Sequence, residues 1–235
     1  MNKEQIKNRA YNQCPFDHRC EKECTKWAIL EQVNEDQLQI KPCPCAEKVE
    51  RHYRYFTANI EPEYWDFTVD SIDEDFDQSI IDDYVSVFIN KTSACVVNKV
   101  SILFHGSSGS GTTSIAVIIL KHCLDAGYKG RIFTATEIIN KLYGAKISDL
   151  YDYDILVIDG IDRLNKDMLK QDFSLAMADL MEKKAVVFTS LVPPHKLHGY
   201  HQDFINRISN IPNVKFKDIN FREAMASKFD SVKES

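Results

Sequence analysis

The sequence lacks a hydrophobic run long enough for a membrane-spanning helix, which needs roughly 18 consecutive apolar residues. Glycine and proline number only 8 and 7, too few for a collagen-like or low-complexity chain. The first 20 residues contain no apolar core, so we expect no secretory signal and a cytoplasmic protein. The 235 residues, 44% of them hydrophobic, suit one large domain or a medium domain with a small appendage.

The charge is unevenly distributed along the chain. The formal net charge is −6, from 29 basic and 35 acidic residues, and ten of the acids fall within residues 61–83, which contain no base. The flanks are slightly basic, with ten bases against nine acids in residues 1–60 and nineteen against sixteen in residues 84–235. This layout is compatible with a basic face that binds phosphate, and equally with an acidic solvated linker that has no further role.

Four short apolar segments in the second half of the chain predict buried strands. They alternate with helical patterns, which favours an α/β fold with a parallel sheet and helices on both faces. The predicted strands are VSILFHG (100–106), GRIFTA (130–135), YDILVIDG (153–160) and AVVFTS (185–190). We expect Thr136 and Asn165 to cap two of the intervening helices. Apolar residues within 80–89 recur at helical spacing and predict an amphipathic helix before the first strand.

A glycine-rich segment joins the first predicted strand to an apolar helix. Its residues are Gly106, Ser107, Ser108, Gly109, Ser110, Gly111, Thr112 and Thr113. Glycines let the backbone amides turn inward and the helix N-terminus adds partial positive charge, so the segment predicts a P-loop that binds ATP or ADP. Thr112 stands where the P-loop motif has its lysine. A hydroxyl cannot supply that charge-assisted hydrogen bond of ~1.5–3 kcal/mol, so we expect phosphate affinity to fall by about tenfold to a hundredfold.

The strand at 153–160 predicts the second part of a nucleotide site. Its Asp159 is in the position of a Walker B carboxylate, which would hold Mg²⁺ through water beside Thr113. Gly160 follows where many such ATPases have the acidic residue that activates water, so we expect slow hydrolysis or none. If the site is merely degenerate, replacing Thr112→Lys together with Gly160→Glu should raise ATP turnover.

Two residues later in the chain are predicted to act on the terminal phosphate. Thr189, near the end of the strand 185–190, is suited to sensing the γ-phosphate. Arg207, in a later helix, is placed to reach the nucleotide of a neighbouring subunit as an arginine finger.

Five of the seven cysteines are clustered near the start of the chain. They are Cys14, Cys20, Cys24, Cys43 and Cys45. In a cytoplasmic protein such a cluster favours a metal over disulfides, and four thiolates suit tetrahedral Zn²⁺. An iron–sulfur cluster would use the same ligands, and unliganded thiols are the remaining alternative. Cys95 and Cys123 stand alone in apolar stretches, so we expect them to fill space in the core.

These motifs, in this order, resemble the bacterial and phage helicase loaders, AAA+ proteins related to transposition-helper ATPases. The stretch RYFTANIEPEYWDFTVDSI (54–72) is similar to the segment that precedes the core in this family and lies near the adenine. The resemblance covers about residues 54–225. It implies a five-stranded parallel sheet, ATP and Mg²⁺ at the P-loop, oligomerisation through nucleotide, and contacts with a replicative helicase or loader subunits and with single-stranded DNA.

These features divide the chain. The cysteine cluster predicts a Cys-rich domain at 1–55, and the acidic stretch predicts a linker with a helix at 56–95. The resemblance implies that the Cys-rich domain contacts a partner and that residues 96–235 form an AAA+ core without a full helical lid. Thr112 and Gly160 both differ from the family at positions that bind phosphate or activate water. We therefore expect a degenerate subunit that binds nucleotide weakly. The alternatives are a catalytically inactive adaptor that uses the AAA+ fold as a scaffold, and a transposition-helper-type ATPase that binds duplex DNA.

Overall fold

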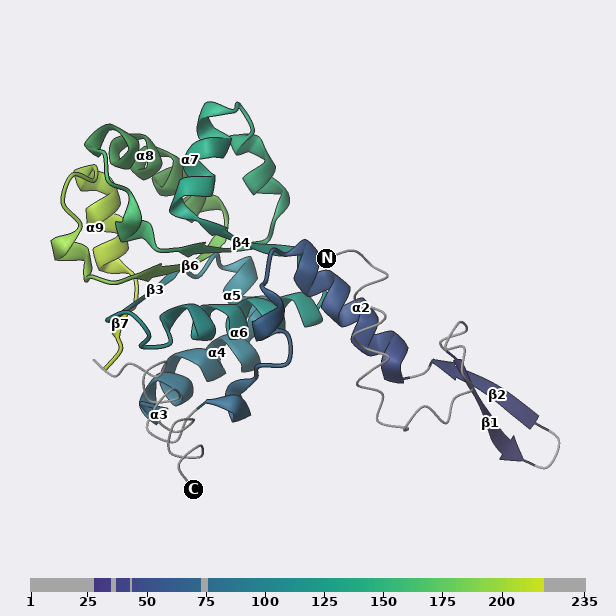
Figure 1. The fold of residues 1–235 in the computed structure, drawn as a ribbon. Coiled ribbons are helices and arrows are strands. Elements are labelled where there is room, and N and C mark those ends of the chain that lie inside the picture. Colours follow the sequence, from purple (N-terminus) through teal and green to yellow (C-terminus); the bar gives the residue numbers. More distant parts are fainter. Residues whose placement is uncertain (1–27, 35–36, 43, 73–75, 218–235) are drawn as a thin grey trace, which may run out of the picture. The chain divides into compact units, whose positions relative to one another are not determined.

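The computed structural model describes residues 28–34, 37–42, 44–72 and 76–217 (Figure 1). The chain forms two compact units, Met1–Trp65 and Asp66–Ser235. In the first unit, strand β1 (Ala28–Asn34) pairs antiparallel with strand β2 (Gln37–Pro42). Helix α2 (Pro44–Thr57) follows and continues through residue 55, where the sequence suggested a boundary.

The end of the first unit is anchored by Trp65, which is almost completely buried. The indole Nε1 donates a hydrogen bond to the carbonyl of Ile60 at 2.9 Å, and the indole ring lies 4.9 Å from the ring of His52 on α2. The segment after α2, which includes the 3₁₀ turn η1 (Pro62–Tyr64), therefore folds back against its own helix.

The second unit is built on a five-stranded parallel sheet in the order β4-β5-β6-β3-β7. The strands are β3 (Ile102–His105), β4 (Gly130–Thr134), β5 (Ile155–Asp159), β6 (Ala185–Ser190) and β7 (Asn213–Lys215). Strands β3, β5 and β6 are buried along their whole length, as parallel strands between two helical layers must be. The four predicted strands and the α/β class are confirmed. The edge strand β7 is too short and polar to have been recognised from its pattern.

Helices cover both faces of this sheet. Figure 1 shows α7, α8 and α9 on one side and α4, α5 and α6 on the other. Their bounds are α4 (Ser86–Asn90), α5 (Thr92–Val97), α6 (Thr112–Asp125), α7 (Ala135–Tyr143), α8 (Asp167–Lys183) and α9 (Gln202–Asn210). The 3₁₀ turns of this unit are η2 (Val69–Ser71), η4 (Ile147–Asp152), η5 (Ile161–Arg163) and η6 (Pro194–Lys196).

The amphipathic helix predicted before the first strand is confirmed. It runs through α3 (Gln78–Ile80), a π-helical stretch η3 (Ile81–Val85) and α4. Its apolar positions are turned inward: Ile80, Ile81, Val85 and Phe88 are buried, whereas Asp82 and Asp83 are exposed. Among the described residues, no helix is long and apolar enough to cross a membrane.

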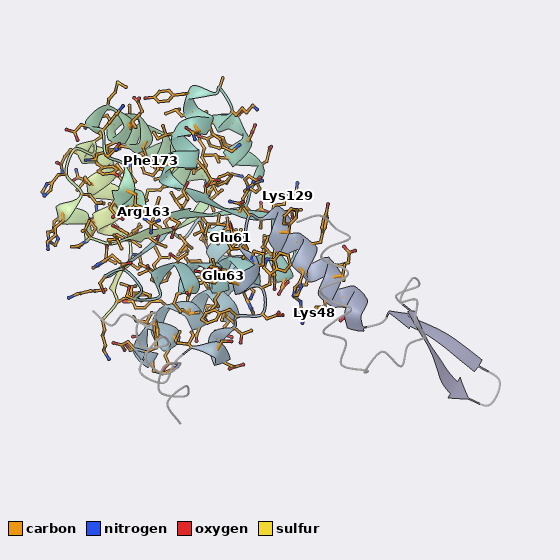
Figure 2. The ribbon with its side chains drawn as sticks, in the orientation of Figure 1. Lys48, Glu61, Glu63, Lys129, Arg163 and Phe173 are labelled. Atoms are coloured by element: carbon orange, nitrogen blue, oxygen red, sulfur yellow. The ribbon has the colours of Figure 1, made fainter. Side chains whose placement is uncertain are left out.

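Alternate residues of the strands pack into one hydrophobic core with α7, α8 and α9. Leu103, Leu156, Ile158, Val186 and Phe188 contribute to it from the sheet. Phe173 of α8 (Figure 2) is fully buried there and meets the ring of Phe204 edge to face at 5.8 Å. Cys95 and Cys123 are also buried, as expected, and burial raises the pKa of the Cys123 thiol to about 12, so this thiol stays protonated at neutral pH.

The two predicted N-caps were wrong. Helix α7 begins two residues earlier than expected, because Thr134 and Glu137 form a capping box: each side chain bonds to the backbone N–H of the other residue. Helix α8 has Lys166 rather than Asn165 at its N-cap, and no side chain caps it there.

Replacing Thr134→Ala should lower the free energy of unfolding by about 1 kcal/mol, because the capping box loses its hydroxyl. The measurement is equilibrium urea unfolding. Thr136→Ala is the matched control, two residues away and exposed, and it should change stability by less than about 0.5 kcal/mol. Equal effects of the two substitutions would show that the capping box contributes nothing.

Candidate nucleotide site

The predicted phosphate loop runs from the end of β3 to the start of α6. The amide of Gly106 donates to the carbonyl of Ser190 on β6 at 3.1 Å, which ties the loop to the neighbouring strand. Helix α6 begins at Thr112, and Gly111 at its N-cap is left-handed, with φ 94°. No side chain caps this helix, so the amides of its first turn are left for another acceptor.

Close packing at Gly106 leaves no room for any other residue. A Cβ there would lie 2.7 Å from Ser110 Oγ and 2.8 Å from Phe216 Cβ. Ser110 is itself 1% exposed, and its hydroxyl has no hydrogen-bond partner within the part of the chain that the structure describes. A buried hydroxyl without a partner costs free energy, and a bound anion would supply the missing acceptor. The loop therefore fits a phosphate group.

Two other segments of the chain, the start of α6 and the end of β6, converge on Asp159 at the end of β5. Its Oδ1 accepts hydrogen bonds from the hydroxyls of Thr113, at 2.7 Å, and Thr189, also at 2.7 Å. Thr189 in turn accepts a hydrogen bond from the amide of Gly160 at 2.9 Å. The structure thus brings together Asp159, Thr113 and Thr189, which the sequence had proposed for one site. Hydroxyl and carboxylate oxygens are ligands of the kind that Mg²⁺ prefers, so this set fits that ion.

The turn after Asp159 departs from what the sequence suggested. Gly160 is left-handed, with φ 67°, and a Cβ on it would lie 2.7 Å from both Cδ and Nε of Arg163. A glutamate at position 160 would be strained and would have to displace the arginine. The structure therefore argues against the expectation that Gly160→Glu together with Thr112→Lys raises ATP turnover. Asp162 is engaged elsewhere, since its Oδ1 accepts the amide of Leu191 at 2.9 Å.

Two aromatic residues that the sequence did not single out lie beside the loop. Phe216, just after β7, packs edge to face against Phe104 of β3 and against Phe76. The Phe76 ring also comes within 3.5 Å of the place where Gly111 would carry a Cβ. Phe76 belongs to the acidic stretch before α3, so this stretch reaches the phosphate loop. No local motif identifies either phenylalanine, because both are brought to the loop only by the fold.

His105 is the buried strand residue immediately before the loop. Burial lowers the pKa of its imidazole, and the nearby charges of Lys215 and His195 lower that pKa further. The fold therefore favours the neutral form of His105 beside the loop.

Arg207 lies on α9 and is bound to carboxylates of its own chain. Its Nε donates to Asp203 at 2.9 Å and its Nη1 to Glu182 of α8 at 2.6 Å. The hydrogen bond with Asp203, followed by that with Glu182, raises the pKa of Arg207. The structure does not join Arg207 to the Asp159 cluster of the same chain.

The cysteine cluster falls mostly outside the described residues. Cys14, Cys20, Cys24 and Cys43 lie outside them, and Cys45 is the second residue of α2. Among the residues whose side chains are described, no group of three or more His, Cys, Asp or Glu is arranged to hold a metal ion.

The sheet order and the glycine loop after β3 define an α/β P-loop fold of the AAA+ type. No protein-family model and no curated protein matches the sequence. Solved structures do match. The DnaC helicase loader has a TM-score of 0.55 at 18% identity, over 67% of this chain and 100% of that one. DnaI has a TM-score of 0.55 at 16% identity, over 67% of this chain and 94% of its own.

The replication initiator DnaA, bound to AMPPCP and single-stranded DNA, is also similar. Its TM-score is 0.51 at 19% identity, over 68% of this chain and 51% of that one. The present chain therefore spans about half the length of that DnaA structure. At these identities the likenesses establish the fold alone, which this chain shares with helicase loaders and with DnaA.

Replacing Thr189→Val should destabilise the protein by about 1–3 kcal/mol, because it leaves the buried Gly160 amide without a partner and removes one of the two hydroxyls bound to Asp159 Oδ1. Urea unfolding checks this value. Thr189→Ser keeps the hydroxyl and should recover most of the loss. A valine variant as stable as the wild type would mean that these hydrogen bonds do not hold the site together.

Proposed function

We propose that this chain is a nucleotide-binding AAA+ protein of DNA replication, which acts with a replicative helicase or its loader on single-stranded DNA. The observation that carries the proposal is the convergence of Thr113, Thr189 and Asp159 at the mouth of a glycine loop that contains the unpartnered Ser110 hydroxyl. The DnaC match is a helicase loader, and the DnaA match carries both AMPPCP and single-stranded DNA. Both likenesses support this assignment over an unrelated P-loop activity.

In this proposal the backbone amides of residues 107–113 bind the phosphates of ATP or ADP. Thr113 and Asp159 hold Mg²⁺, directly or through water, and the ion neutralises phosphate charge when it is bound. Thr189 keeps Asp159 oriented and is the candidate sensor of the γ-phosphate. Gly160 has no group that could accept a proton from an attacking water, so in this proposal the chain hydrolyses ATP slowly or not at all.

Arg207 is proposed to act across a subunit interface. Its ion pairs with Asp203 and Glu182 fix the guanidinium on the surface formed by α8 and α9. A neighbouring subunit that docks there would meet an arginine already held in place. Oligomerisation through nucleotide is part of the same proposal.

A titration with a fluorescent ATP analogue and Mg²⁺ tests nucleotide binding. Ser108 is exposed at the loop and is not left-handed, so Ser108→Asp adds a negative charge there without strain. Two like charges a few ångströms apart near a surface repel by about 1–4 kcal/mol, so affinity should fall about tenfold or more.

The matched control for this titration is Ser148→Asp, an exposed serine in η4 that makes the same change of charge away from the loop. It should bind like the wild type. Wild-type protein that binds the analogue no better than Ser108→Asp would instead favour the adaptor, in which the AAA+ fold serves only as a scaffold.

We also propose that the cysteine cluster binds Zn²⁺. Ala28 of β1 lies opposite Pro42 of β2, so the chain enters and leaves the hairpin at the same end. Cys24 is four residues before that end and Cys43 directly follows it, a separation that the chain can span at about 3.4 Å per residue. The hairpin thus supports a site that combines the early cysteines with Cys43 and Cys45.

Elemental analysis of the purified full-length chain tests the metal. We expect about one equivalent of zinc per chain, because one tetrahedral site uses four thiolates. Cys24→Ser should lower this content, whereas Cys95→Ala, at a buried cysteine of the core, should leave it unchanged. Iron in place of zinc would indicate an iron–sulfur cluster, and neither metal would indicate unliganded thiols.

A further inference from the structure

Arg163 lies on the turn that follows the Asp159 strand. The turn η5 is closed by the Arg163 amide, which donates to the carbonyl of Gly160 at 3.0 Å. The side chain folds back over Gly160 and places its Nη1 3.8 Å from Asp159 Oδ2. This carboxylate oxygen is the one that does not receive the two threonine hydroxyls. Arg163 therefore lies beside Asp159, on the side that the two threonines leave free.

The path of the arginine depends on the glycine beneath it. Any Cβ at position 160 would lie 2.7 Å from Arg163 Cδ and Nε and 3.2 Å from its Cγ. The side chain of an acidic residue and the folded-back arginine cannot share this space. The position of the Arg163 side chain thus depends on the absence of a side chain at Gly160.

The phosphate loop has a deficit of positive charge that this arrangement can meet. Residues 106–113 contain no charged side chain, and Asp159 adds a negative charge next to the expected phosphates. Mg²⁺ held at Asp159 would offset part of this negative charge, but the phosphate loop itself supplies no cation to a triphosphate. Within the described residues, Arg163 is the basic residue that forms an ion pair with Asp159.

The ion pair between Arg163 and Asp159 is loose. At 3.8 Å it is well beyond the ~2.7–2.9 Å of a strong charge-assisted hydrogen bond. The Arg163 side chain is also 59% exposed. Its guanidinium therefore keeps N–H donors available, in the planar fork that matches two oxygens of a phosphate.

We propose that Arg163 supplies the cation that the phosphate loop lacks at Thr112 and that it binds the β- and γ-phosphates of a nucleoside triphosphate. This proposal rests on the proposed nucleotide binding and deepens it. The site then has its cation on the turn after β5, with Gly160 in place of an acidic residue because the arginine needs that space. In this view the two departures from the P-loop pattern compensate each other.

The test compares charge-neutral variants by fluorescence titration with the ATP analogue and Mg²⁺. Arg163→Gln should weaken binding by about tenfold to a hundredfold, the range expected for losing a hydrogen bond to a charged group. Arg163→Lys, which keeps the charge without the fork, should fall between this variant and the wild type. Lys166→Gln is the matched control, an exposed lysine three residues away, and should change affinity less than about twofold.

A second substitution tests whether Arg163 acts through its positive charge or only supports the local structure. In the Arg163→Gln background, Thr112→Lys should restore at least about tenfold of the lost affinity, because it returns a positive charge to the usual position. The same Thr112→Lys in the wild type should gain less, since Arg163 already neutralises the site. Thermal unfolding without nucleotide should be nearly the same for wild type and Arg163→Gln, because the side chain is largely exposed.

Each contrary outcome has a distinct meaning. Wild-type protein that binds no better than Ser108→Asp overturns the proposed nucleotide site itself. Binding by the wild type that is unchanged in Arg163→Gln overturns only the role of Arg163. Tighter binding of the ATP analogue by Arg163→Gln would show that the guanidinium competes with Mg²⁺ for Asp159. If only Lys215→Gln, on β7, lowered the affinity, Lys215 would be the cation of the site instead of Arg163. Either result overturns the inference.

Discussion

The hydrogen bonds that meet at Asp159 Oδ1 hold the carboxyl end of the sheet together. Thr113 brings the first turn of α6, and Thr189 brings the end of β6, to the end of β5. Thr189 also accepts the amide of Gly160, so the turn after β5 is fixed by the same hydroxyl. Because a charged acceptor strengthens each bond, this small network determines where the loop, the turn and the arginine lie.

The tight packing around the loop serves the same arrangement. Gly106 allows Ser110 and Phe216 to approach the backbone, and Phe216 links the edge strand region to Phe104 and Phe76. The loop is therefore enclosed by residues from the start and from the end of the second unit. Packing against these neighbouring residues holds the backbone of the loop in place, although the loop lacks a lysine.

The turn after β5 changes how the departures from the P-loop pattern are understood. Taken one at a time, Thr112 and Gly160 are losses of function. With Arg163 in the role proposed above, they instead describe a site whose positive charge comes from a different segment, with the arginine side chain lying where an acidic residue at position 160 would need room. Nucleotide binding without efficient hydrolysis is the behaviour that such a site favours, because it gains a cation and has no base.

The sequence alone determined the α/β class, four of the five strands, the amphipathic helix before them, and the candidate set of Thr113, Asp159 and Thr189. These follow from local patterns, in which apolar β-branched runs and a glycine loop have few alternative structures. Only the tertiary structure decided the short strand β7, the capping box at Thr134, and the positions of Phe76, Phe216 and Arg163. Each of these depends on contacts between residues far apart in the chain or on side-chain direction in a turn. Periodicity and motif spacing carry no information about such contacts, because they describe neighbours along the chain and not neighbours in space.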